Sequence, residues 1–221
     1  MRTMEWQGIC LDQGWQIRAS ARLQPARRLD GLVAFGEQRT ADYDVTWQLS
    51  TDTAWAAERL DVRVVGSASG GDRLNRTLLL ERTSEGWRSR AWASDAAALP
   101  VPGLVVADYP STTVDAVIDA CPLSHWAPIR RLGLAGPRPV VRRGGPSRPL
   151  AAAQPVLRVR LPSLSVVLTR QRYSWVADAG TGRLLRHSFA GGSPAEITVD
   201  SLGVPLEFDG LTRRPDSAQV A

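Results

Sequence analysis

Residues 43–49, YDVTWQL, alternate large apolar side chains with polar ones at every second position. Successive side chains of a β-strand point to opposite faces of the sheet, so this pattern places one set in a core and the other in water. The apolar set is Tyr43, Val45, Trp47 and Leu49. The same period recurs in residues 15–23 (WQIRASARL) and 59–65 (RLDVRVV), and we predict a strand at each.

Strand patterns continue along the rest of the chain. Residues 73–82 and 87–92 flank the turn TSEG and predict a hairpin. Later runs, separated by turn sequences such as DAGTG and GGSP, are residues 156–162, 164–176, 184–190, 196–200 and 204–208. Helical signals are short, as in residues 55–60 (WAAERL) after a candidate cap at Thr51 or Asp52. We therefore predict a mainly-β fold: a strongly curved, mostly antiparallel sheet of about ten strands with few short helices.

The length of 221 residues suits a single β domain, which we expect over residues 1–214. Residues 135–155 are rich in Pro, Gly and Arg and predict an exposed loop, and residues 215–221 predict a flexible tail. The chain lacks an apolar run long enough to span a membrane and lacks the pattern of a secretion signal. We expect a cytoplasmic protein.

The chain carries a net charge of +5, and all 27 of its cationic side chains are arginines. These arginines are scattered along the sequence and interspersed with acidic residues, whereas a nucleic-acid footprint concentrates them on one helix or face. Nucleic acid is therefore a second choice of partner.

Patterns for catalysis and for cofactors are weak. Two cysteines and two histidines lack the spacing of a zinc site. The segment GSASG, residues 66–70, has Ala68 where a nucleophile elbow needs serine, and neither a Walker nor a dinucleotide-binding motif occurs. We expect no metal, no cofactor and no enzymatic activity.

The segment CPLSHWAPIRRLGL, residues 121–134, concentrates reactive residue types. Cys121 and His125 would form a thiol–imidazole pair on a helix, but the two flanking prolines favour a rigid turn. If the residues after the turn enter a strand, Arg130 and Arg131 point to opposite faces and one of them needs an anionic partner. That partner is either an internal carboxylate such as Asp115 or a ligand head group.

Eight tryptophans outnumber the phenylalanines and tyrosines together. Either they pack in the core, or several of them line a cavity for an apolar or sugar-bearing ligand. We place His187, in the strand pattern LLRHSFA, on the polar face of the sheet.

The chain resembles the bacterial family of putative glycolipid-binding proteins, whose centre reads approximately P-[FL]-T-N-T-L-P-I-R-R-L. Here residues 122–132 read PLSHWAPIRRL, which keeps the P-I-R-R-L frame and replaces Thr-Asn-Thr by Ser124-His125-Trp126. The flanking matches are Glu5–Trp6, the strand of residues 43–49, Leu161–Leu164, Gln171–Tyr173, and Asp200 with Gly203 and Val204.

This resemblance implies a spiral β-roll, similar to the half-open barrels of bacterial lipoprotein carriers, around a hydrophobic groove. It implies binding of a lipid or glycolipid-like small molecule, with transient contact to a membrane surface. We expect tryptophans to line the groove and arginines to face a polar or anionic head group at its mouth. The expected ligand-binding residues are Trp47, Trp126, Arg130, Arg131, Gln171 and Tyr173.

Three other hypotheses stay open at this stage. One is a nucleic-acid-associated basic protein, and one is a structural protein whose groove is only a core. The third is an enzyme centred on Cys121 or His125.

Overall fold

The fold is built on one large β-sheet. The computed structural model describes residues 2–10, 15–25, 31–67, 71–94, 98–105, 109, 112–135, 153–180, 182–190 and 192–213. The first-half strands are β1 (Arg2–Cys10), β2 (Trp15–Pro25), β3 (Leu32–Arg39), β4 (Tyr43–Thr51), β5 (Ala57–Ser67), β6 (Arg73–Thr83) and β7 (Gly86–Ala93). The later elements are β8 (Gly103–Leu104), β9 (Asp115–Ile118), η1 (Pro122–His125), α1 (Trp126–Arg131), β10 (Ala153–Val159), β11 (Ser165–Ala179), β12 (Gly182–Phe189), β13 (Ala195–Val199), β14 (Pro205–Phe208) and β15 (Leu211–Arg213).

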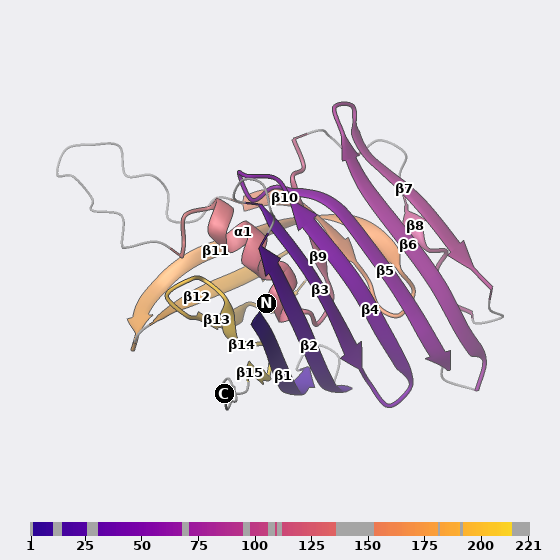
Figure 1. Ribbon diagram of the computed structural model, residues 1–221, viewed down its shortest axis with the longest axis horizontal. Coiled ribbons are helices and arrows are strands. Elements are labelled where there is room, and N and C mark those ends of the chain that lie inside the picture. Colours follow the sequence, from indigo (N-terminus) through magenta and orange to yellow (C-terminus); the bar gives the residue numbers. More distant parts are fainter. Residues whose placement is uncertain are drawn as a thin grey trace.

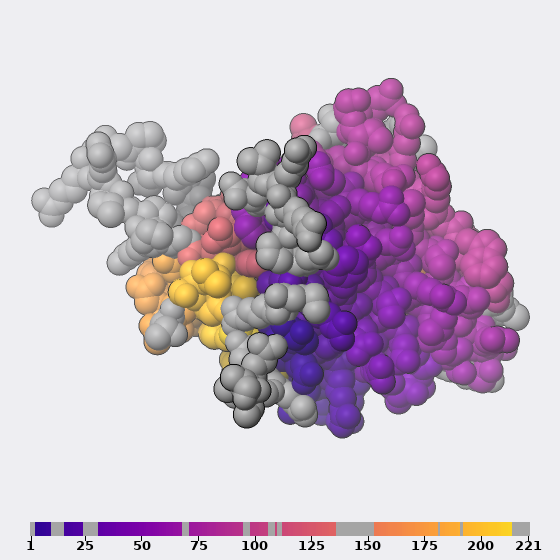
Figure 2. Space-filling view, in the orientation of Figure 1, coloured from indigo at the N-terminus to yellow at the C-terminus, as the bar shows by residue number. Residues whose placement is uncertain are grey.

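The sheet runs in the order β7-β6-β5-β4-β3-β2-β1-β15-β14-β13-β12-β11-β10-β9, with β8 paired to β11. Among the strands that the structure describes, the pairs are antiparallel except for β9 with β10 and β8 with β11. The two ends of the chain therefore meet in the middle of the sheet, where β1 pairs with β15. Figure 1 labels β1 and β15 side by side, and Figure 2 shows the yellow C-terminal atoms and the indigo N-terminal atoms on the same face of the molecule.

The sheet curls on itself without closing, so its two halves share an interior (Figure 1). An amide of Ala57, at the start of β5, donates to the Val114 carbonyl beside β9, and Trp87 Nε1 donates to the Thr113 carbonyl. The main hydrophobic core accordingly joins side chains of β1–β7 to those of β9–β11. The prediction of a mainly-β, strongly curved antiparallel sheet is confirmed, and the described residues form fifteen strands rather than about ten.

The period-two pattern of residues 43–49 is confirmed in β4. Its apolar side chains are 6% or less exposed, whereas the neighbouring Asp44 and Thr46 are exposed. The hairpin predicted over residues 73–92 is β6–β7. The strands that the pattern did not indicate are β1, β3, β8, β9 and β15.

The segment after Cys121 is helical, and the strand expected there is wrong. Pro122 begins the 3-10 helix η1, and Pro128 lies in the first turn of α1. Amides of the first turn make no hydrogen bond within a helix, so a proline there removes none. Both prolines therefore support helix rather than interrupt it. Figure 1 shows α1 within the curve of the sheet, and its Ile129 packs with side chains of β11–β14 in a second core cluster.

One further local expectation is wrong, and another differs at one end. Residues 55–60 do not form a helix, because the Asp52 carboxylate accepts hydrogen bonds from the amides of Ala54 and Ala56 and closes a turn before β5. The loop expected over residues 135–155 ends earlier, because β10 begins at Ala153. Residues 136–152 and the tail at 215–221 lie outside the described residues.

Candidate functional site

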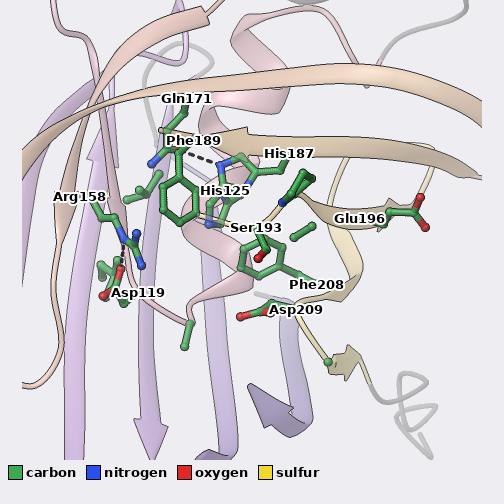
Figure 3. Close-up of a pocket in the computed structure, with 16 residues that line it drawn as sticks. Asp119, His125, Arg158, Gln171, His187, Phe189, Ser193, Glu196, Phe208 and Asp209 are labelled. Atoms are coloured by element: carbon green, nitrogen blue, oxygen red, sulfur yellow. Dashed lines mark hydrogen bonds and ion pairs between the residues drawn. The ribbon is translucent and has the colours of Figure 1, made fainter. Parts of the chain in front are cut away.

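The inner face of the second half of the sheet carries a pocket of about 620 Å³. Its lining comes from the ends of β9 and η1, from strands β10–β14, and from the segments between them (Figure 3). The lining residues with polar or aromatic side chains are Asp119, His125, Arg158, Gln171, His187, Phe189, Ser193, Glu196, Phe208 and Asp209.

Aromatic rings form the deep part of the pocket. The ring centroids of His125 and Phe208 are 4.3 Å apart, those of His125 and His187 are 5.0 Å apart, and those of His187 and Phe189 are 5.8 Å apart. His125 and His187 are only 4% and 3% exposed, so little of either ring reaches solvent. The arrangement offers aromatic faces and edges together with ring nitrogens.

The two histidines belong to a buried hydrogen-bond network on β11. The Tyr173 hydroxyl lies 2.7 Å from His125 Nδ1 and 3.0 Å from Gln171 Oε1. His187 Nε2 lies 3.0 Å from the same Gln171 oxygen. Gln171 Nε2 donates in turn to the Thr169 hydroxyl. Five side chains from three separate elements are thereby held in one geometry.

Burial keeps both histidines neutral at neutral pH. Desolvation lowers the pKa of His125 well below its usual value, and the nearby His187 and Arg158 lower it further. Desolvation, with a smaller contribution from Arg158, lowers the pKa of His187 to about 4. The same effect raises the pKa of Tyr173 well above its usual value. The network therefore contains only uncharged groups.

An ion pair closes one side of the pocket. The Asp119 carboxylate accepts a hydrogen bond from Arg158 Nε, and the Arg158 guanidinium lies 4.4 Å from the centroid of the Phe189 ring. Desolvation raises the pKa of Asp119, and the charge of Arg158 opposes that rise. At the rim, Glu196 and Ser193 are exposed and Asp209 is half-buried.

Of the six residues expected to bind ligand, Gln171 alone is among those that line the pocket. Tyr173 lies behind Gln171 and holds His125. Trp47 packs in the main core against the backbone of Gly36. Trp126 contacts Trp55 edge-on and donates Nε1–H to the Leu202 carbonyl, while Arg130 lies over the Trp55 ring.

The partner of the inward-pointing arginine is internal. Arg131 donates from Nε and Nη2 to the two oxygens of Asp115, and Nη2 also contacts the Gln154 amide oxygen. Asp115 is 1% exposed, so the guanidinium offsets the cost of burying its carboxylate. The question of whether this arginine faces a carboxylate or a ligand is answered in favour of Asp115.

Cys121 and His125 are both buried, and each has its own surroundings. Burial raises the pKa of the Cys121 thiol to about 12, so it stays protonated at neutral pH. His125 uses its Nδ1 to bind Tyr173. Within the ranges described above, no three His, Cys, Asp or Glu side chains gather in a way that could hold a metal ion.

The expectation that His187 lies on the polar face is wrong. Leu185, His187 and Phe189 alternate with exposed or half-buried residues, and β12 turns this set inward. The period of two was the available signal, because it groups His187 with an apolar residue on each side. No comparable signal marks Asp119, Arg158 or Phe208, which reach the pocket through the pairing of strands distant in sequence.

The fold and pocket define a mainly-β protein whose curved, unclosed antiparallel sheet holds a small-molecule-sized cavity on its inner face. A crystal structure of a DUF1089 family protein from Pseudomonas aeruginosa shares this fold, with a TM-score of 0.56 and 21% identity over 86% of this chain and 88% of that one. The chain belongs to the family described as "Putative glycolipid-binding", whose model matches residues 18–214.

The comparison with curated proteins finds no match. None of the helices in the described part of the chain has the length and apolar character that crossing a membrane requires.

Proposed function

We propose that the protein binds an amphipathic, lipid-like molecule of the glycolipid class in the pocket beside η1, without altering it chemically. The observation that carries this proposal is the composition of the pocket wall, which combines the rings of Phe189 and Phe208 with the hydrogen-bonding groups of His125, Gln171 and His187. Sugar rings present apolar C–H faces and hydroxyl groups together, and such a wall suits both. The family description points to the same class of ligand.

The size of the pocket supports a small-molecule ligand. Its volume of about 620 Å³ falls within the range of roughly 300–1,000 Å³ that is typical of ligand sites. The polar network lies at its inner end and the exposed Ser193 and Glu196 lie at its rim. A head group bound at the inner end would leave an alkyl chain directed toward the opening between β13 and the end of β14.

Binding fits the pocket better than catalysis or nucleic-acid recognition does. Cys121 is neutral and does not belong to the pocket lining, so it supplies no nucleophile there. At the rim, the exposed Arg186 is paired with Glu196 at 3.9 Å, so this arginine is already engaged. Two of the arginines that could have served nucleic acid, Arg131 and Arg213, are instead paired with Asp115 and Asp200.

A steric block tests the proposal. Ala195 is half-buried and lines the pocket, so Ala195→Trp fills it, whereas Ala93→Trp places the same side chain on the exposed end of β7. With n-octyl β-D-glucoside as the probe in isothermal titration calorimetry, we expect binding by the native protein and by Ala93→Trp. In Ala195→Trp the affinity should fall at least about tenfold, which corresponds to about 1.4 kcal/mol. Absence of binding by the native protein, or equal binding by all three, contradicts the proposal.

A further inference from the structure

The direction of each hydrogen bond in the Gln171 network follows from one backbone carbonyl. The Thr169 hydroxyl donates to the carbonyl of Val156 on β10 and therefore accepts from Gln171 Nε2. This contact fixes the orientation of the Gln171 amide, because its nitrogen must face Thr169. Gln171 Oε1 then faces Tyr173 and His187.

An amide oxygen accepts hydrogen bonds and cannot donate them, so both of its partners must be donors. The Tyr173 hydroxyl gives its single proton to Gln171 Oε1, and the Tyr173 oxygen is left to accept from His125 Nδ1–H. His187 likewise donates Nε2–H to Gln171 Oε1. The network therefore assigns one proton-bearing nitrogen to each histidine.

A neutral imidazole carries one proton, so the opposite nitrogens, His125 Nε2 and His187 Nδ1, carry lone pairs. Both rings are neutral because their burial disfavours the charged form. Among the described residues neither nitrogen has a hydrogen-bond partner, and neither is among the fully buried unpaired polar atoms. Both rings line the pocket, so these lone pairs open onto it.

The remaining charged groups of the pocket are mostly acceptors as well. The lining includes the carboxylates of Asp119, Glu196 and Asp209 and the guanidinium of Arg158, and Glu196 also pairs with Arg186 at 3.9 Å. That guanidinium donates to Asp119 and packs against the Phe189 ring. At the inner end of the pocket an anionic head group would therefore meet histidine lone pairs and an arginine that already donates to Asp119, whereas a hydroxyl group would find acceptors for its proton.

We infer that the pocket selects an uncharged, hydroxyl-rich head group, such as a neutral glycosyl group, and rejects a phosphate or carboxylate head group. This inference rests on the proposed function and specifies the ligand that the same site takes. Its basis is the pair of histidine lone pairs, His125 Nε2 and His187 Nδ1, fixed by the network behind them. It replaces the expectation that arginines face an anionic head group at the mouth of the groove.

The direct test compares three probes that share one alkyl chain at pH 7.5: n-octyl β-D-glucoside, n-octyl phosphate and octanoate. Isothermal titration calorimetry should give the glucoside an affinity at least about tenfold higher than either anion. Equal or tighter binding of an anion overturns the inference while leaving the proposed function intact. Absence of binding by all three probes overturns the proposed function and, with it, the choice of ligand.

Two further measurements test the histidine protonation and the effect of charge at the rim of the pocket. Nitrogen-15 NMR of the histidine rings should show protons on His125 Nδ1 and His187 Nε2 in the free protein, and the reverse assignment overturns the inference. Glu196→Lys adds a donor at the rim and should raise n-octyl phosphate affinity at least about threefold. Glu58→Lys makes the same change of net charge at an exposed site outside the pocket lining. An equal gain in this control contradicts the role given to the pocket.

Discussion

Acidification should destabilise the fold through His187. The pKa of His187 is lowered to about 4 in the folded protein, from a usual value of 6.5, because its ring is desolvated beside Arg158. The unfolded chain therefore takes up a proton at a higher pH than the folded chain does. The contribution of His187 is fully present above about pH 6.5 and is lost progressively as the pH falls toward 4.

The size of this loss follows from the shift of the pKa. Each pKa unit corresponds to about 1.4 kcal/mol, so the difference between 6.5 and about 4 amounts to about 3 kcal/mol of unfolding free energy between pH 7 and pH 4. The raised pKa values of Asp115 and Asp119 act in the opposite direction over the acidic range. The effect of His187 must therefore be measured as a difference between two proteins that share these aspartates.

The matched variant is His187→Gln, whose amide can donate to Gln171 Oε1 but does not titrate. Urea unfolding followed by tryptophan fluorescence at several pH values gives the free energy of unfolding of both proteins. Between pH 7 and pH 4 the native protein should lose about 3 kcal/mol more than the variant. Parallel profiles for the two proteins would refute the placement of a neutral, desolvated His187 in this pocket.

Two substitutions elsewhere test other parts of the structure by the same unfolding assay. Arg131→Met leaves the Asp115 carboxylate buried without its guanidinium and should lower the free energy of unfolding by about 3–5 kcal/mol. Adding Asp115→Asn removes the unpaired charge and should recover part of this loss. If the double variant is no more stable than Arg131→Met, the pairing is contradicted. At Gly36 a Cβ atom would lie 2.2 Å from Trp47 Cζ2 and 2.8 Å from the Ser20 carbonyl oxygen. Gly36→Ala should therefore cost about 1–3 kcal/mol, and less in a Trp47→Leu background, where the ring is absent. If the losses of unfolding free energy in the two single variants simply add in the double variant, the Trp47 ring is not what limits the space at Gly36.

The sequence predicted ten of the strands in the described residues and missed five, of which β1 and β3 are long and β8, β9 and β15 are short. In β4 and β5 the alternation extends over many residues, and each apolar set is buried as expected. Strands such as β8 and β9 are two and four residues long, and all four residues of β9 are buried, so no alternation marks them. Their existence depends on pairing with β11 and β10, which lie far along the chain.

The segment of residues 121–134 shows where local reasoning reached its limit. The prolines indicated a rigid turn, and the structure contains helical turns at both of them. Whether a strand or a helix followed depended on what lay opposite, and the inner face of β11–β14 provides an apolar surface for Ile129. Because the segment is helical, the helix and not the alternation of a strand directs Arg131 toward Asp115.

The sequence by itself determined that this protein is a curved antiparallel sheet, because a period of two constrains each strand locally and does not depend on which strand pairs with which. Only the tertiary structure decided where a ligand could bind. The register of β11 and β12 sets Tyr173 opposite His187 and Gln171 opposite Phe189, and η1 then brings His125 onto them. Such a pocket exists only once distant strands are in register, so its polarity is a property of the fold and not of any single stretch of the chain.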